Sequence, residues 1–373
     1  MKLAFASIPF AVAVAVVRAV PIKERGIFSD INSLENVLLF DSPAVQDASG
    51  NTLVNVQSYV FLKQFDLDPL TSVLTNGLEK LGIDVEDKID SALDRLSLLA
   101  SIGVPGKEVK VKVAGCDKEA TLPKTSLGDL GLVTGTVSVG KCAGGNTFNA
   151  TVRGNDFTPE VTIFPSSPDG FGVISDIDDT IKISNVLDKI KLAQTTLFDA
   201  PKAVTGMPEV YKSLATSLND PQFIYISGSP YQLYPFLRSF VATSFPDARG
   251  PLFLRNLTIT DLDIILDSFS EDENKKLEYK LSQIARVQAM YPQKNFLTIG
   301  DSTEKDPEIY GEAFKAHGGD FIKCIWIHLV DGADNSDERF SAAFEGVPQD
   351  RIRLFDDSQV ATLADVDVAG GQC

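Results

Sequence analysis

Acidic side chains follow two apolar runs of this sequence, at the points where those runs end. Segment 176–180 (DIDDT) follows the run 171–174, and segment 300–306 (GDSTEKD) follows the run 296–299. Like charges a few ångströms apart repel in a partly buried cleft, and a bound hard cation such as Mg²⁺, which prefers oxygen ligands, relieves that repulsion. A helix-capping turn would explain one Asp, but not three acids and a Thr after a buried strand. The two clusters therefore predict a magnesium site.

A third polar segment could hold the phosphoryl group that such a site would serve. Ser227 ends the apolar run 223–226 and is followed by Gly-Ser-Pro, so a hydroxyl and backbone N–H groups lie at another strand end. These residue types also make ordinary turns. The helix-like stretch 274–291 supplies three amines that could stabilise phosphoryl charge, on Lys275, Lys276 and Lys280.

The elements that would position these groups are five apolar runs separated by helix-like segments. This alternation is typical of an α/β fold, a parallel sheet with helices on its faces. Ligands of such sheets bind at the carboxyl ends of the strands, which is where the polar clusters fall. The five runs are Phe171–Ile174, Phe223–Ile226, Leu252–Leu254, Phe296–Ile299 and Phe321–Val330.

The order of these motifs resembles that of the haloacid dehalogenase superfamily phosphatases. More narrowly, about residues 165–360 resemble the catalytic domain of fungal actin-patch-type phosphatidate phosphatases. The resemblance implies a Rossmann-like parallel sheet of the haloacid dehalogenase type. The segments that carry it are 176–185 (DIDDTIKISN), 223–237 (FIYISGSPYQLYPFL), 250–255 (GPLFLR) and 299–310 (IGDSTEKDPEIY).

The resemblance also implies a catalytic role for each of five residues. Asp176 is expected to attack phosphorus and become an aspartyl-phosphate, while Asp178 protonates the leaving alkoxide and later activates water. Thr180 is expected to support the turn and Ser227 to hydrogen-bond the phosphoryl group. Among the three lysines, Lys280 is expected to stabilise the phosphoryl charge.

The same resemblance implies the magnesium ligands. Asp301 is expected to bind Mg²⁺ together with Asp176 and the backbone carbonyl of Asp178, and Asp306 is expected to join the metal site through water or by supporting a ligand. Since an ordinary Asp has a pKa near 3.9, Asp176 is expected to be ionised. The closeness of Asp176 is expected to raise the pKa of Asp178 and keep it protonated.

Residues before the catalytic segment have a different character. Alternation of apolar and polar residues predicts a smaller β-rich domain over 26–164, with paired strands around a turn at 47–51. Helical spacing predicts a helical insertion at about 68–100. The catalytic domain is predicted over 165–360, with a Pro- and Ser-containing linker at its start, 165–170, and residues 361–373 are expected to form a C-terminal tail.

The N-terminus predicts entry into the secretory pathway. Lys2 is followed by an apolar run to Val17, and cleavage after Ala19 would remove residues 1–19 as a signal peptide. The run is shorter than the roughly 20 residues of a transmembrane helix. We therefore expect a secreted or luminal protein without a transmembrane segment.

An oxidising compartment would permit disulfides and glycans. Of the four cysteines, Cys116 and Cys142 follow neighbouring β-like segments and are expected to pair, whereas Cys324 is expected to be a small core residue. Asn149 and Asn256 begin triplets that could accept glycans.

The net charge and the resemblance also predict which partners and substrates the protein binds. The net charge of −17 disfavours a nucleic-acid partner and weakens adsorption to anionic lipid, although peripheral membrane contact is compatible with it. The resemblance implies hydrolysis of phosphatidate to diacylglycerol and phosphate. Soluble phosphomonoesters or lysophospholipids are alternative substrates, and a secreted binding protein without turnover is the alternative from another class.

Overall fold

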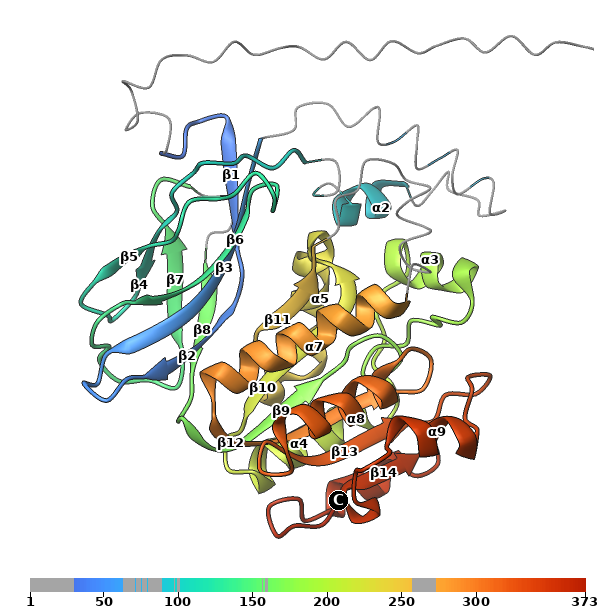
Figure 1. The fold of residues 1–373 in the computed structure, drawn as a ribbon. Helices are drawn as coiled ribbons and strands as arrows, with labels where there is room; N and C mark the ends of the chain where they lie inside the picture. The colour runs from blue at the N-terminus through green and yellow to red at the C-terminus, as the bar shows by residue number, and fades with distance from the viewer. Residues whose placement is uncertain are drawn as a thin grey trace, which may run out of the picture.

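The structure is a computed structural model that describes residues 30–62, 71, 75, 79, 89–96, 98, 101–155, 157, 160–256 and 273–373. The predicted signal peptide, most of the predicted helical insertion and the Thr of the Asn256 triplet lie outside these residues. The described chain forms two sheets, one at the left and one at the centre and lower right of Figure 1. The chain passes from the first sheet to the second at residues 166–168, within the predicted linker.

The first sheet has eight strands and confirms that the N-terminal region is rich in β-structure. Its order is β1-β3-β2-β8-β7-β4-β5, with β6 pairing to β3, and all its pairs are antiparallel except β2 with β8. The predicted turn at 47–51 joins β2 to β3, where the Asp47 carboxylate accepts from the backbone N–H groups of Ser49 and Asn51. The strands are β1 (Glu35–Leu39), β2 (Ser42–Gln46), β3 (Thr52–Leu62), β4 (Lys110–Val113), β5 (Glu119–Thr121), β6 (Leu132–Ser138), β7 (Phe148–Val152) and β8 (Val161–Pro165).

The second sheet has six strands, and every paired strand in it is parallel. Its order is β11-β10-β9-β12-β13-β14, so β9 lies between β10 and β12 at the centre. Four strands contain predicted apolar runs, a fifth, β13, lies within the predicted run Phe321–Val330, and the sequence prediction missed the sixth, β14. The strands are β9 (Asp169–Ser175), β10 (Gln222–Pro230), β11 (Leu252–Arg255), β12 (Gln293–Asp301), β13 (Ile322–His328) and β14 (Ile352–Phe355).

Helices cover both faces of this sheet. Neighbouring residues on its strands point to opposite sides, so each face has its own core. Val173 packs in one core with buried residues of α3, α4 and α5, and Ile174 packs in the other with residues of α7, α8 and α9. Figure 1 shows α7 and α8 side by side in front of the sheet. The helices are α2 (Ile89–Leu96), α3 (Lys189–Leu197), α4 (Met207–Ser217), α5 (Tyr234–Ser244), α7 (Glu273–Met290), α8 (Asp306–His317) and α9 (Asp337–Ala343). In the described part of the chain, no helix is long and apolar enough to cross a membrane.

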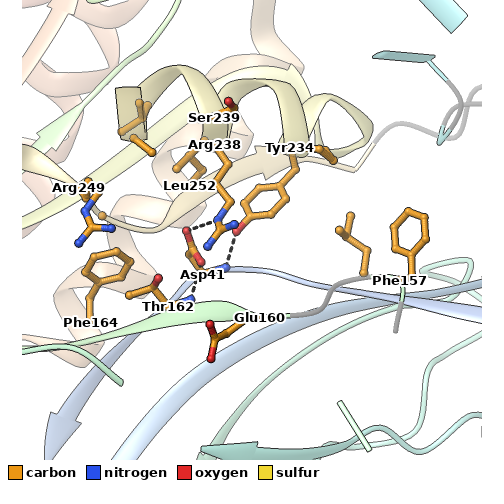
Figure 2. Close-up of a pocket in the computed structure, with 15 residues that line it drawn as sticks. Asp41, Phe157, Glu160, Thr162, Phe164, Tyr234, Arg238, Ser239, Arg249 and Leu252 are labelled. Atoms are coloured by element: carbon orange, nitrogen blue, oxygen red, sulfur yellow. Dashed lines mark hydrogen bonds and ion pairs between the residues drawn. The ribbon is translucent and has the colours of Figure 1, made fainter. Parts of the chain in front are cut away.

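The two sheets are joined by polar contacts beside a cavity of about 490 Å³ (Figure 2). Asp41, after β1, accepts from Arg238 Nε on α5 at 2.8 Å and from the backbone N–H of Thr162 at 2.7 Å. The backbone N–H of Asp41 donates to the Tyr234 hydroxyl at 2.6 Å. These contacts tie the first sheet to α5, the helix that follows the Ser227 strand end.

Two disulfides connect the four cysteines. The predicted Cys116–Cys142 bridge is confirmed, although the strands that precede these residues, β4 and β6, do not pair with each other. The prediction for Cys324 is wrong in one respect: it is buried, but it is bonded to Cys373. The C-terminus folds back against β13, where Trp326 Nε1 donates to the Cys373 carbonyl at 2.9 Å.

The segment predicted as a C-terminal tail is packed rather than extended. Leu363, Val366 and Val368 lie in the core that contains α4. Because the Cys324–Cys373 bridge closes a separation of 49 residues, we expect Cys373→Ser to lower the free energy of unfolding by about 2–4 kcal/mol. Urea unfolding with and without reductant checks this, and a variant as stable as the oxidised wild type would contradict it.

Candidate active site

Asp176 lies at the carboxyl end of the central strand, where a βα sheet places its chemistry. It follows β9 directly, and its backbone N–H donates to the Ile299 carbonyl of the neighbouring strand β12. Its side chain is buried, with Oδ1 at 2.8 Å from Lys280 Nζ and Oδ2 at 3.2 Å from the Thr180 hydroxyl. Thus one carboxylate meets a cation from α7 and a hydroxyl from its own loop.

Two further carboxylates meet Asp176 at this end of the sheet. Asp301 ends β12 and Asp306 begins α8, and one oxygen of each lies within 4.8 Å of the others and of an Asp176 oxygen. Thr180 Oγ1 lies 3.1 Å from Asp301, and Lys280 Nζ lies 2.6 Å from Asp306. Gly300 allows this approach, since a Cβ there would lie 2.4 Å from an Asp306 oxygen. We call Asp176, Asp301 and Asp306 the carboxylate cluster.

Burial opposes ionisation throughout this cluster. Burial raises the pKa of Asp176 well above its ordinary value, the charge of Lys280 opposes that rise, and Asp306 and Asp301 add to it. Burial and the charge of Asp306 raise the pKa of Asp301 to about 8. Burial also raises the pKa of Asp306, against the charge of Lys280. The expectation that Asp176 ionises like an ordinary Asp is therefore wrong for the metal-free protein.

The cluster fits a hard divalent cation. Three buried carboxylates share one ammonium group, Lys280, whose own pKa is raised by Asp176 and Asp306 in spite of its burial. With all three carboxyls ionised, as on metal binding, the cluster would carry more negative charge than Lys280 balances, and all its donors are the oxygen ligands that Mg²⁺ prefers. Asp176, Asp301 and Asp306 are the side chains that could hold the ion.

These raised pKa values predict how stability depends on pH. Between about pH 4 and pH 8 the folded, metal-free protein holds protons on groups such as Asp301 that the unfolded chain has already released. The folded state binds more protons in that window, so its free energy of unfolding falls as pH rises, by about 1.4 kcal/mol per unit of pKa difference. Since Mg²⁺ binds deprotonated carboxylates, added Mg²⁺ should raise Tm more at pH 8 than at pH 5.

Thermal melts with EDTA or Mg²⁺ at the two pH values check this prediction. Asp301→Asn removes one titrating carboxylate and one candidate ligand, so it should reduce both the pH dependence and the Mg²⁺ effect. The prediction fails if this variant melts with the same pH and Mg²⁺ dependence as the wild type.

Asp178 contacts a different set of groups. The prediction that its pKa is raised is wrong. Burial would raise its pKa, but the charge of Lys182 and hydrogen bonds from Ser184, Ser229 and Ser227 hold it below its ordinary value. Asp176 is not among the largest causes of the shift. The carboxylate of Asp178 is therefore ionised in the free protein, and its side chain is not part of the carboxylate cluster.

The contacts of Asp178 are short and come from two strand ends. Its Oδ2 accepts from Ser227 at 3.1 Å and from Ser229 at 2.8 Å, both at the end of β10. Its Oδ1 accepts from Ser184 at 2.6 Å and lies 3.4 Å from Lys182 Nζ. Ser227, the predicted phosphoryl-binding hydroxyl, therefore touches Asp178 directly.

A tight turn after Asp178 brings Lys182 and Ser184 back to it. Asp179 has a φ of 54°, in the left-handed region that Asp tolerates better than most residues. Its carboxylate accepts from the backbone N–H groups of Ser184, Asn185 and Val186. The turn therefore fixes the loop that carries two contacts of Asp178.

The structure distinguishes the three candidate lysines. Lys280 contacts Asp176, while Lys276 pairs with Glu304 and Lys275 is exposed. Lys276 and Glu304 line a small pocket together with Asp178, Gly228, Ser229, Val186 and Leu192. Lys276 thus faces the space in front of Asp178 rather than the carboxylate cluster.

Sequence reasoning missed Lys182 and Ser184 as neighbours of Asp178 and treated Ser229 and Glu304 only as members of their segments. The missed signal is the spacing from Asp178, since Lys182 and Ser184 lie four and six residues beyond it. His328 of β13 is a buried residue with hydrogen-bond partners. Its ring nitrogens lie 3.1 Å from the Asp179 carbonyl and 2.8 Å from Asp357.

Comparison with known proteins shows which family this part of the chain resembles. Residues 171–329 match the family model described as "Phosphatidate phosphatase APP1, catalytic domain". The chain is 34% identical over 147 residues to a protein of Saccharomyces cerevisiae named "Phosphatidate phosphatase APP1". Over residues 171–329 the chain is thus similar to the APP1 catalytic-domain family. All the site residues described above fall within that span.

The match covers part of each protein. The 147 aligned residues are 39% of this chain and 23% of the S. cerevisiae protein. An uncharacterised protein of Schizosaccharomyces pombe, C29B5.04c, is 30% identical over 147 residues, which are 38% of this chain and 22% of that protein. The chain thus spans less than a quarter of the length of these curated relatives, and the first sheet lies outside the matched family span.

Proposed function

We propose that this APP1-type catalytic domain is a magnesium-dependent phosphatase of the haloacid dehalogenase type that hydrolyses phosphatidate to diacylglycerol and phosphate. The observation that carries the proposal is the meeting of Asp176, Lys280, Asp301 and Asp306 at the carboxyl end of the central parallel strands. The family of the domain supports the same substrate class.

In the first step, an Asp176 carboxylate oxygen attacks the phosphorus atom, and the bond from phosphorus to the glycerol oxygen breaks. Lys280 Nζ, 2.8 Å from Asp176, balances charge on the nucleophile and on the transferred group. A bound Mg²⁺ would lower the negative charge of the carboxylate cluster and of the phosphoryl oxygens. The product of the step is an aspartyl-phosphate on Asp176.

Asp178 acts as the general acid in the first step and as the general base in the second. A phosphoryl group beside Ser227 would bring negative charge next to Asp178 and raise its pKa from the low value of the free protein. Protonated Asp178 gives its proton to the leaving alkoxide, and the resulting carboxylate then takes a proton from the water that hydrolyses the aspartyl-phosphate. Phosphate leaves, and Asp176 is regenerated.

The two disulfides of the structure support the proposal that the protein works in an oxidising compartment. Together with the predicted signal peptide, they favour a secreted or luminal phosphatase. Asn149, an exposed residue of β7, could then carry a glycan.

The substrate is tested by comparing phosphate release from phosphatidate in mixed micelles with release from water-soluble phosphomonoesters, with Mg²⁺ or EDTA. We expect magnesium-dependent release, with a higher kcat/KM for phosphatidate. Equal or better turnover of the soluble esters would overturn the lipid assignment. Release that is unchanged by EDTA would overturn the role of the metal.

A further inference from the structure

Exposed apolar side chains gather on one segment beside the phosphoryl site. In the described part of the chain ten large apolar side chains are exposed, and only four of these lie in residues 169–373, which form the second sheet with its helices and loops. Three of the four fall within residues 183–190: Ile183, Leu187 and Ile190, which are 37%, 50% and 44% exposed. We call these three residues the apolar rim.

The rim continues directly from the wall of the active-site pocket. Val186 and Leu192 of the same segment line that pocket with Asp178 and Ser229, and Ser184 donates to Asp178 at 2.6 Å. A surface that contacts the rim would therefore lie at the entrance to the site where the phosphoryl group is proposed to bind.

The exposed side chains are held in place by local hydrogen bonds. The Asp179 carboxylate anchors the backbone at 184–186, and Asp188 caps α3 by accepting from the N–H groups of Ile190 and Lys191. Packing across the helix start, as in a hydrophobic staple from Leu187 to Leu192, would explain part of this arrangement. It does not explain why Leu187 stays half exposed, nor why Ile190 points to solvent on the first turn.

Charge around the rim differs from that of the whole chain. Residues 183–197 contain two lysines and one Asp, whereas the chain carries a net charge of −17. Lys189 and Lys191 are exposed next to Ile190. Apolar side chains interleaved with lysines suit a lipid–water interface, where the apolar groups enter the acyl boundary and the amines meet lipid phosphates.

We propose that the apolar rim docks the catalytic domain on an anionic lipid surface and so presents phosphatidate to the pocket. This inference rests on the proposed function, because its occupant is the surface that contains the substrate. The local lysines counter the repulsion that the acidic chain would otherwise meet at such a surface.

The test is the double variant Leu187→Asp/Ile190→Asp, with Leu127→Asp as the matched control. Leu127 is 75% exposed between β5 and β6 of the first sheet, so the control makes the same substitution away from the rim. We expect the double variant to lose about tenfold or more in hydrolysis of phosphatidate in phosphatidylcholine vesicles, from the lost burial of two apolar side chains. Turnover of short-chain monomeric phosphatidate should be unchanged, and the control should match the wild type on both substrates.

Binding is measured separately from catalysis, in the Asp176→Asn background. Cosedimentation with the same vesicles should fall about tenfold with the two rim substitutions. In addition, Leu187→Trp should give a blue-shifted fluorescence on vesicles, since the only natural Trp, Trp326, is fully buried. Wild-type vesicle binding by the double variant, or no fluorescence shift of Leu187→Trp, would overturn the docking proposal. Failure to hydrolyse phosphatidate in any form would overturn the proposed function while these binding measurements still decide the role of the rim.

Discussion

Replacing Asp176 with Asn is expected to lower phosphate release by about 10⁴-fold or more, the scale of loss when a covalent nucleophile is removed. An amide cannot accept the phosphoryl group as a carboxylate does, although it keeps the size and shape of the side chain. The contacts of Asp176 with Lys280 and Thr180 indicate that the site would otherwise remain assembled. Steady-state phosphate release with phosphatidate measures the loss.

The control for this variant is substrate binding. Asp176→Asn should bind phosphatidate micelles as the wild type does, because the serines, Lys280 and the apolar surfaces are unchanged. A non-catalytic binding protein would also keep its ligand, but its wild type would release no phosphate. Residual activity of Asp176→Asn within about tenfold of the wild type would rule out Asp176 as the nucleophile.

Replacing Lys280 with Met is expected to lower kcat by about 10²–10³-fold, as when one preorganised donor to a transition state is removed. Lys280 Nζ lies 2.8 Å from Asp176 and 2.6 Å from Asp306, so its loss also leaves two buried carboxylates without their cation. Breaking a buried ion pair in this way costs about 3–5 kcal/mol of stability. Kinetics and urea unfolding should therefore both change.

Two neighbouring lysines on α7 provide matched controls. Lys275→Met, at an exposed position, should change neither kcat nor stability measurably. Lys276→Met removes the partner of Glu304 at the pocket entrance and should affect KM more than kcat. If Lys276→Met lowered kcat more than Lys280→Met did, the amine that stabilises phosphoryl charge would have to be reassigned to Lys276.

The parallel sheet could be predicted because its strands are continuous apolar runs with polar residues at their ends. Strands β9, β10 and β12, with Asp176, Ser227 and Asp301 at or near their carboxyl ends, follow from that pattern alone. Strand β14 could not be predicted in the same way. It has four residues at the edge of the sheet, three of them only partly buried or exposed, so its sequence lacks the apolar signal of a central strand.

The composition of the carboxylate cluster could be predicted, but the surroundings of Asp178 could not. The cluster depends on which strands are neighbours, and motif order indicates that. The Asp178 contacts depend on the left-handed backbone of Asp179, a local conformation that the sequence permits without requiring. Similarly, the Cys324–Cys373 bridge depends on how the C-terminus folds back, which cysteine spacing does not determine.

The most direct test of the account is to locate the covalent phosphoryl group. The protein is mixed with phosphatidate and Mg²⁺, quenched in acid during turnover, digested and mapped by mass spectrometry. The account predicts one phosphoryl group on the peptide that contains Asp176, removed by hydroxylamine as an acyl phosphate is. A phosphoryl group found instead on Ser227 or Ser229, or turnover without any phosphorylated peptide, would contradict it.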